Sequence, residues 1–103
     1  MLKLIALYPQ PNDIEKFEKD YEIHILLLHE KMGIPKDVKP YKVTTMLPTP
    51  TGQSKFYKMF SMPFNSPEEL QEAMASEGMQ KVAADAVRIS SGGPPEIIIG
   101  DEE

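Results

Sequence analysis

The 103-residue sequence lacks cysteine and tryptophan. Without cysteine the chain can hold no disulfide scaffold, no thiolate metal site and no cysteine nucleophile, and this composition fits a reducing cytoplasm. Basic residues are scarce, because 11 lysines and arginines stand against 16 acidic residues and leave a formal net charge of -5. That sign disfavours nucleic acid and anionic membranes as partners. No run approaches the ~18 apolar residues of a membrane span, and the apolar start is too short for a secretory signal.

Ten prolines divide the chain into segments, because proline is excluded from helix interiors and from central strands. Residues 2–8 are apolar on both alternating faces, which predicts a central strand covered on both sides. Asn12 and Glu15 form a capping box, so we expect a helix over 13–31 that ends at Gly33. Its apolar stripe consists of Ile14, Phe17, Tyr21, His24 and Leu28.

The second half of the chain contains two strand signals, one helix start and one helix break. Residues 41–47 and 56–62 are rich in β-branched and aromatic side chains, and the turn-forming residues between them predict a hairpin. Ser66 begins a strong N-cap pattern followed by proline, while Gly78 should break or kink the helix that follows. A short strand is expected over 96–100.

The order strand, helix, strand, strand, helix, strand predicts a single α+β domain over 1–103. We expect a ferredoxin-like βαββαβ fold, in which a four-stranded antiparallel sheet carries its helices on one face. The other face would be bare and apolar, with Tyr57 and Met59 on it, so a second copy should cover it. The predicted assembly is a homodimer that forms a dimeric α+β barrel.

His24 is the main candidate for chemistry, because its position on the apolar stripe buries an ionisable ring. Two interpretations are open: a structural histidine satisfied by a carbonyl or a tyrosine hydroxyl, or a functional group.

His29 should lie at the surface near the helix end, where a partly charged ring suits the helix dipole. With only these two histidines and no matched ligand spacing, we expect no metal site.

Asp85 lies on a helix otherwise lined with alanine and valine, so its carboxylate needs partners. We expect it to accept hydrogen bonds from amides near Gly92 and Gly93, or to pair with Lys81 or Arg88. The seven methionines could line a pliable apolar cavity, although core filling is the commoner role; the candidates are Met46, Met59, Met62, Met74 and Met79.

The chain resembles the EthD family of small dimeric α+β barrel proteins in three places: the strand at 3–8, the FxxxYxxH pattern of Phe17, Tyr21 and His24, and the string Ser76, Glu77, Gly78 followed by Ala84 and Asp85. The resemblance covers nearly the whole chain. It implies a ferredoxin-like subunit, a homodimer, and a cavity between the helices and the sheet into which His24 projects. Leu26 departs from the family pattern, which tends to place a proline there.

Two functions follow from the residues and the resemblance together. The first is a small cofactor-free enzyme, or an accessory subunit, that binds an apolar or aromatic small molecule near His24. Neutral His24 would act as general base while a tyrosine hydroxyl polarises a carbonyl or phenol. Among Tyr8, Tyr21, Tyr41 and Tyr57 we expect Tyr21 to serve, with ligand contacts from Phe17, Met59 and Asp85. The alternative is a non-catalytic binding or structural homodimer.

Overall fold

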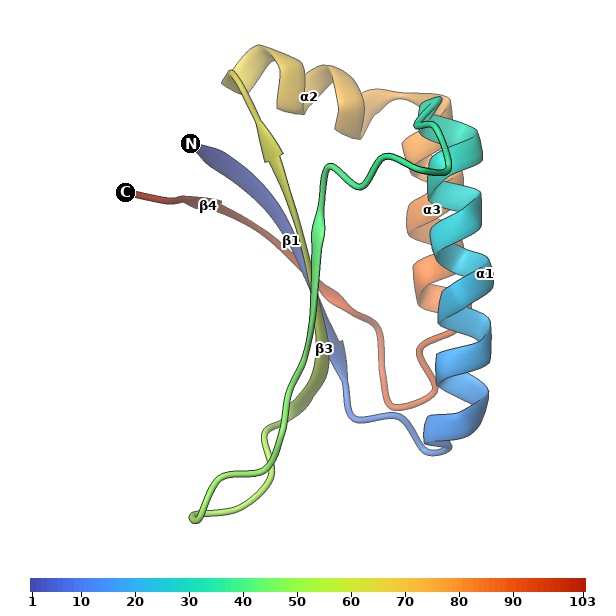
Figure 1. Cartoon of the computed structure of the whole chain (residues 1–103), viewed down its shortest axis with the longest axis vertical. Coiled ribbons are helices and arrows are strands. Elements are labelled where there is room, and N and C mark those ends of the chain that lie inside the picture. The colour runs from blue at the N-terminus through green and yellow to red at the C-terminus, as the bar shows by residue number, and fades with distance from the viewer.

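The computed structural model describes residues 1–103 as one four-stranded antiparallel sheet with two longer helices on one side and a short helix across one end (Figure 1). In chain order the elements are β1 (Leu2–Pro9), α1 (Ile14–Met32), β2 (Lys42–Thr45), β3 (Phe56–Phe64), α2 (Pro67–Ala75), α3 (Glu77–Arg88) and β4 (Glu96–Asp101). The strands lie in the order β2-β3-β1-β4. The ferredoxin-like fold predicted from the order of elements is therefore confirmed. None of the helices is both long and apolar enough to cross a membrane.

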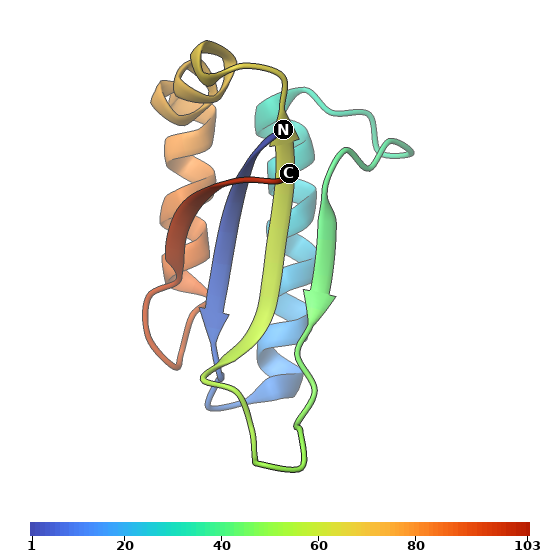
Figure 2. The same ribbon diagram turned by 90° about the vertical axis from the view of Figure 1, so that its left-hand side faces the viewer.

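β1 is a central strand, as predicted, and it pairs with β3 and β4, but it is not covered on both sides within the single chain. One of its faces carries Leu4, Ala6 and Tyr8, which are buried beneath the helices. Its other face is only half-buried, because nothing in the single chain covers it (Figure 2). On this open face Leu7 lies opposite Met59, since paired residues on neighbouring strands point to the same side.

α1 begins and ends close to the predicted residues, but its N-cap differs. The side chain of Asp13 accepts a hydrogen bond from the backbone N–H of Lys16 at 3.1 Å, so Asp13 rather than Asn12 caps the helix. Asn12 instead donates its side-chain amide to the carbonyl of Ser91. At the other end Gly33 has φ 66°, the left-handed conformation that favours glycine after a helix.

The predicted stripe of α1 faces the sheet, apart from its first member. Phe17, Tyr21, His24 and Leu28 are buried, whereas Ile14 at the start of the helix is 48% exposed. His29 is buried as well, so the surface position expected for it is wrong.

His29 is buried because the segment after the helix folds back over it. Its ring accepts a hydrogen bond from the Tyr41 hydroxyl at 2.7 Å and donates to the carbonyl of Pro35 at 3.1 Å. Tyr41 is thereby fixed just before β2, and its ring stacks on Phe60 of β3.

The second helical segment breaks in two, as predicted, but the break falls at Ser76 rather than at Gly78. Ser76 ends α2, and its hydroxyl accepts from the N–H of Met79 to cap α3. Gly78 lies where α3 approaches α1. A Cβ at this position would lie 2.6 Å from the Lys31 carbonyl oxygen, so the glycine permits close packing of the two helices.

Tyr57 does not lie on the open face of the sheet. The pairing of β1 with β3 shifts between Tyr8 and Pro9. This irregularity changes the face of the sheet to which the first side chains of β3 point. The Tyr57 ring therefore packs edge-on against Phe17 of α1, and its hydroxyl donates to Glu18 at 2.6 Å. The predicted face is wrong for Tyr57 and correct for Met59.

Candidate functional site

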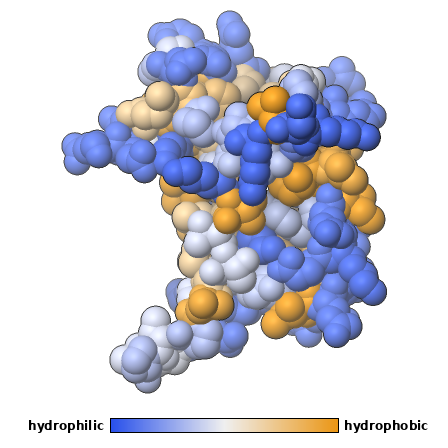
Figure 3. Space-filling model, viewed as in Figure 1, coloured by the Kyte–Doolittle hydropathy of each residue, from blue (hydrophilic) through white to orange (hydrophobic).

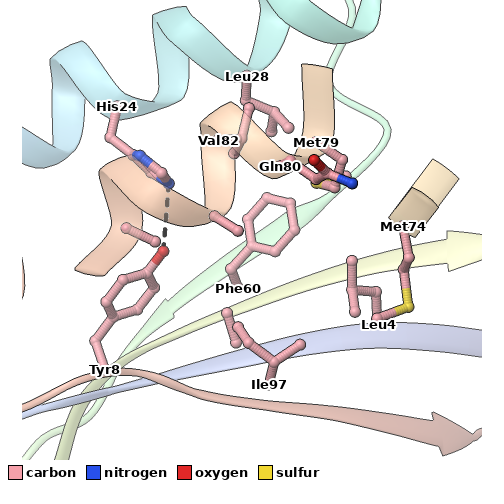
Figure 4. Close-up of a pocket in the computed structure, with 13 residues that line it drawn as sticks. Leu4, Tyr8, His24, Leu28, Phe60, Met74, Met79, Gln80, Val82 and Ile97 are labelled. Atoms are coloured by element: carbon pink, nitrogen blue, oxygen red, sulfur yellow. Dashed lines mark hydrogen bonds between the residues drawn. The ribbon is translucent and has the colours of Figure 1, made fainter. Parts of the chain in front are cut away.

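A cavity of about 290 Å³ lies between the sheet, α1 and α3. Hydrophobic side chains form most of its wall, with Leu4 and Ala6 from β1 and Val82 and Ala86 from α3. The exceptions are His24 and Gln80. Figure 4 shows the rings of His24 and Tyr8 at one end of this space, with Met74, Met79 and Gln80 toward the other.

The cavity exists because small residues face one another across the sheet and α3. Ala6 lies in the middle of the helix-covered face of β1, and Ala83 and Ala86 supply the neighbouring surface of α3. Larger residues around them hold the helix and the sheet apart. The volume lies just below the usual range for small-molecule sites in proteins, roughly 300 to 1,000 Å³.

His24 connects α1 to α3 through Asp85. The distance from His24 Nδ1 to Asp85 Oδ2 is 2.9 Å. A carboxylate can only accept, so Nδ1 carries the hydrogen and donates it. This fixes the tautomer of the neutral ring, because Nε2 is then left as an acceptor. Nε2 is the nitrogen on the side of the cavity, 3.4 Å from the Tyr8 hydroxyl (Figure 4).

Arg88 holds the other oxygen of the same carboxylate. Its Nε donates to Asp85 Oδ1 at 2.7 Å, across one turn of α3. One of the pairings predicted for Asp85 is thus confirmed, while Lys81 lies closest to Glu77 instead. The contact with His24 was not predicted, because the two residues lie 61 positions apart in the sequence.

Burial and hydrogen bonding set the charges of these groups. Burial lowers the pKa of His24 below its usual value and outweighs the Asp85 hydrogen bond, which raises it. Burial alone would raise the pKa of Asp85, but the hydrogen bonds from Arg88 and His24 bring it below its usual value. Burial also raises the pKa of the Tyr8 hydroxyl. At neutral pH the site therefore contains a neutral imidazole, an ionised carboxylate and a neutral phenol.

The tyrosine next to the Nε2 atom of His24 is Tyr8, where the sequence had favoured Tyr21. The hydroxyl of Tyr21 is buried and has no hydrogen-bond partner, and its ring lies 4.7 Å from the ammonium group of Lys58. Tyr41 and Tyr57 are paired with His29 and Glu18 respectively. Tyr8 is the tyrosine beside His24 Nε2 because β1 runs directly beneath His24. The order of the strands alone did not reveal this arrangement.

Three further predicted residues lie outside the cavity wall. Phe17 packs behind it, edge-on to Tyr8 at 5.6 Å between ring centroids. Met59 lies on the open face of the sheet, on the opposite side from His24. Asp85 lies behind the His24 ring.

Of the methionines proposed as cavity residues, Met74 and Met79 line the wall. The sequence analysis missed Gln80 and the other aliphatic side chains of the wall as site residues, although Val82 and Ala86 lie at helical spacing from Met79. No group of three or more histidine, cysteine, aspartate or glutamate side chains is placed to hold a metal ion.

No protein-family model matches the chain, and no curated protein matches it either. Among solved structures, an EthD family protein from Bacillus halodurans C-125 is 34% identical; the match covers 100% of this chain and 99% of that one, with a TM-score of 0.83. An EthD-like protein from Ralstonia eutropha JMP134 is 17% identical, with 97% and 89% covered and a TM-score of 0.67. A dimeric ferredoxin-like protein of unknown function from Jannaschia sp. CCS1 is 10% identical, with 98% and 97% covered and a TM-score of 0.69. The last two show a shared fold.

Proposed function

This chain belongs to the EthD family, and from that premise we propose that it binds an apolar or aromatic small molecule beside His24 and removes a proton from it. One observation carries the proposal: an ionised Asp85 holds Nδ1 of a neutral, buried imidazole whose Nε2 borders an apolar cavity. A positioned general base has this arrangement: a carboxylate orients an imidazole, and the other nitrogen of the imidazole faces the space where a ligand can bind.

The reaction moves a proton and an electron pair without any oxidant. Nε2 of His24 takes an acidic hydrogen from a carbon next to a carbonyl group of the ligand. The electrons of the broken C–H bond form an enolate, whose negative oxygen accepts a hydrogen bond from Tyr8. Asp85 stabilises the imidazolium that forms. Return of the proton to the same or another atom completes an exchange or an isomerisation.

The apolar wall supports this chemistry. A dipole such as the Tyr8 O–H interacts more strongly with a developing oxyanion when water is excluded. The 3.4 Å separation of the Tyr8 hydroxyl from His24 Nε2 is a weak hydrogen bond, so a ligand displaces it at little cost.

Binding is tested with 2-naphthol, an uncharged aromatic probe. We expect the ring resonances of His24 to move on titration by NMR, while those of His29, which lies outside the cavity, stay in place. At 100 times its Kd the probe should add roughly 2.7 kcal/mol of apparent stability. Ala83→Leu narrows the cavity and should abolish binding, whereas Ala84→Leu on the same helix should not.

The competing function, a non-catalytic structural dimer, is favoured by the fact that both ring nitrogens of His24 already have partners. That reading predicts no movement of the His24 resonances and no effect of 2-naphthol on the melting temperature. Such a result would exclude the binding proposal.

The second part of the proposal concerns assembly: two copies pack through the open faces of their sheets. The apolar residues Ile5, Leu7, Met59 and Ile98 share this face and have no cover within one chain. Figure 3 views the sheet from its edge. Hydrophobic side chains reach the surface on the side of the open face, which is the side away from α1 and α3. Two solved structures with the same fold are described as dimeric ferredoxin-like proteins. Burial of these residues would supply the driving force.

Light scattering is expected to give twice the 11.6 kDa chain mass at micromolar concentration. Met59→Glu places a charge at the centre of the proposed interface and should shift the mass toward the monomer. Gln53→Glu adds the same charge in the exposed hairpin loop and should leave the dimer intact. A wild-type monomer that stays in solution would contradict this part of the proposal.

A further inference from the structure

The cavity is closed at the end that contains His24 and Tyr8 and open beyond it. His24 and Tyr8 are only 4% and 2% exposed, so the end with the proposed base is sealed. Met74 of α2 and Ile97 of β4 are 38% and 47% exposed, and Gln80 is exposed too. These three residues therefore mark the mouth, together with Ala83, which is also exposed. In Figure 4 Met74 and Gln80 lie toward the end away from His24, and Ile97 lies between the two ends.

No positive charge faces this space. The lining contains neither lysine nor arginine, and Arg88, which lies behind the closed end, already binds Asp85. The carboxylate of Asp85 adds a negative charge behind His24, in a chain whose net charge is -5. An anionic ligand would lose its hydration without gaining a counter-ion, which is costly in an apolar site.

The mouth carries one polar group with unused hydrogen-bonding capacity. Gln80 Nε2 lies 3.4 Å from the carbonyl of Ala75, at the long limit of a hydrogen bond. The other N–H of the amide and its Oε1 atom have no partner in the fold. Gln80 stands one turn before Ala83 on α3, so its side chain extends from the helix at the rim of the cavity.

We propose that the site selects uncharged aromatic compounds that carry a hydrogen-bonding group at each end, with Gln80 as the residue that recognises the outer group. The inner group, a carbonyl or hydroxyl, meets Tyr8 and His24, and the aromatic body fills the apolar middle. This inference rests on the proposed function, because it names the class of ligand for the same cavity. It assigns a specificity role to a residue that neither the fold nor the proton transfer requires.

The test compares two probes that differ only in the outer hydroxyl, 2-naphthol and 2,6-dihydroxynaphthalene, by calorimetric titration. Gln80→Leu should weaken the diol about fivefold to tenfold, the usual size of one lost hydrogen bond, and leave 2-naphthol within about twofold. Gln71→Leu, an equivalent change at an exposed position of α2, should affect neither probe. Equal affinities of the diol for the parent and for Gln80→Leu would overturn the role of Gln80.

A charged probe tests the second half of the inference. 2-Naphthoate should bind at least tenfold more weakly than 2-naphthol, and equal or tighter binding would overturn selection for uncharged ligands. Failure of the proposed function looks different, because 2-naphthol itself would then neither bind nor move the His24 resonances, and both proposals would fall together. If 2-naphthol moves those resonances but Gln80→Leu changes the affinities for 2-naphthol and for the diol equally, only the inference fails.

Discussion

Replacement of His24 by glutamine is expected to slow proton exchange on a bound ketone by about 10²- to 10⁴-fold, the usual contribution of a general base. The ketone 2-tetralone is a suitable probe, because it is uncharged, has two rings and carries acidic hydrogens next to its carbonyl group. The rate at which solvent deuterium enters these positions is measured by proton NMR. Glutamine keeps a polar side chain on the buried stripe but cannot accept a proton at neutral pH.

The pH dependence of the wild-type rate gives an independent check on the same residue. The base must be neutral to act, and burial lowers the pKa of His24 below the ordinary value of 6.5. The rate should therefore be constant at neutral pH and fall only as the pH drops through this lowered pKa. A rate that already falls above pH 6.5, or an unchanged rate in His24→Gln, would show that another group removes the proton.

The other buried histidine provides the matched control. His29→Gln removes a ring that hydrogen-bonds Tyr41 and the loop after α1, so it should lower stability without changing the exchange rate. If instead His24→Gln lowers the free energy of unfolding by about 1 to 3 kcal/mol, and the parent binds no 2-naphthol, His24 is structural. Urea unfolding of the parent and both variants separates these outcomes.

Much of the fold could be predicted because its signals are local. The helix start at Ser66, the glycine after α1 and the apolar run of β1 each depend on a few neighbouring residues. The structure agrees with the two helix signals and with the central place of β1, but within one chain only one face of β1 is covered. The errors arise where distant segments decide the outcome. His29 was expected at the surface because nothing in the helix itself shows that a later loop will cover it.

The candidate site was predictable only in part for the same reason. Periodicity placed His24 on the buried face of α1, and the resemblance to EthD proteins directed it into a cavity. Which groups it meets depends on how α3 and β1 are set against α1, and no local pattern specifies that alignment. The sequence therefore could not reveal that Tyr8 rather than Tyr21 faces Nε2, or that Asp85 reaches Nδ1. An irregularity in strand pairing likewise moved Tyr57 to the helix side.

The second large effect is expected from Asp85→Asn, which keeps the size of the side chain and removes its charge. The carboxylate fixes the His24 tautomer in which Nε2 is free to accept, and it stabilises the imidazolium. An asparagine amide that donates to Nδ1 would favour the other tautomer, in which Nε2 carries the hydrogen and cannot act as base. The exchange rate should fall by on the order of 10² to 10⁴, by analogy with other carboxylate–histidine pairs.

Asp85 acts through His24 and does not line the cavity, so three further measurements should show the pattern of a positioning residue. The affinity for 2-naphthol should stay nearly unchanged. The acid limb of the rate profile should move to lower pH, because the Asp85 hydrogen bond and charge raise the pKa of His24 and both are lost. Stability should fall by about 1 to 3 kcal/mol, since Arg88 and the Nδ1 hydrogen lose a charged partner.

Asp37→Asn, in the exposed loop after α1, removes the same charge and should leave rate, affinity and stability unchanged. If Asp85→Asn keeps its stability but loses affinity for 2-naphthol, Asp85 contacts the ligand directly, as the sequence analysis had expected. If the variant keeps the full rate while its stability falls, the carboxylate only ties α3 to α1. The rate, the affinity and the unfolding free energy, measured on the same preparation, decide among these roles.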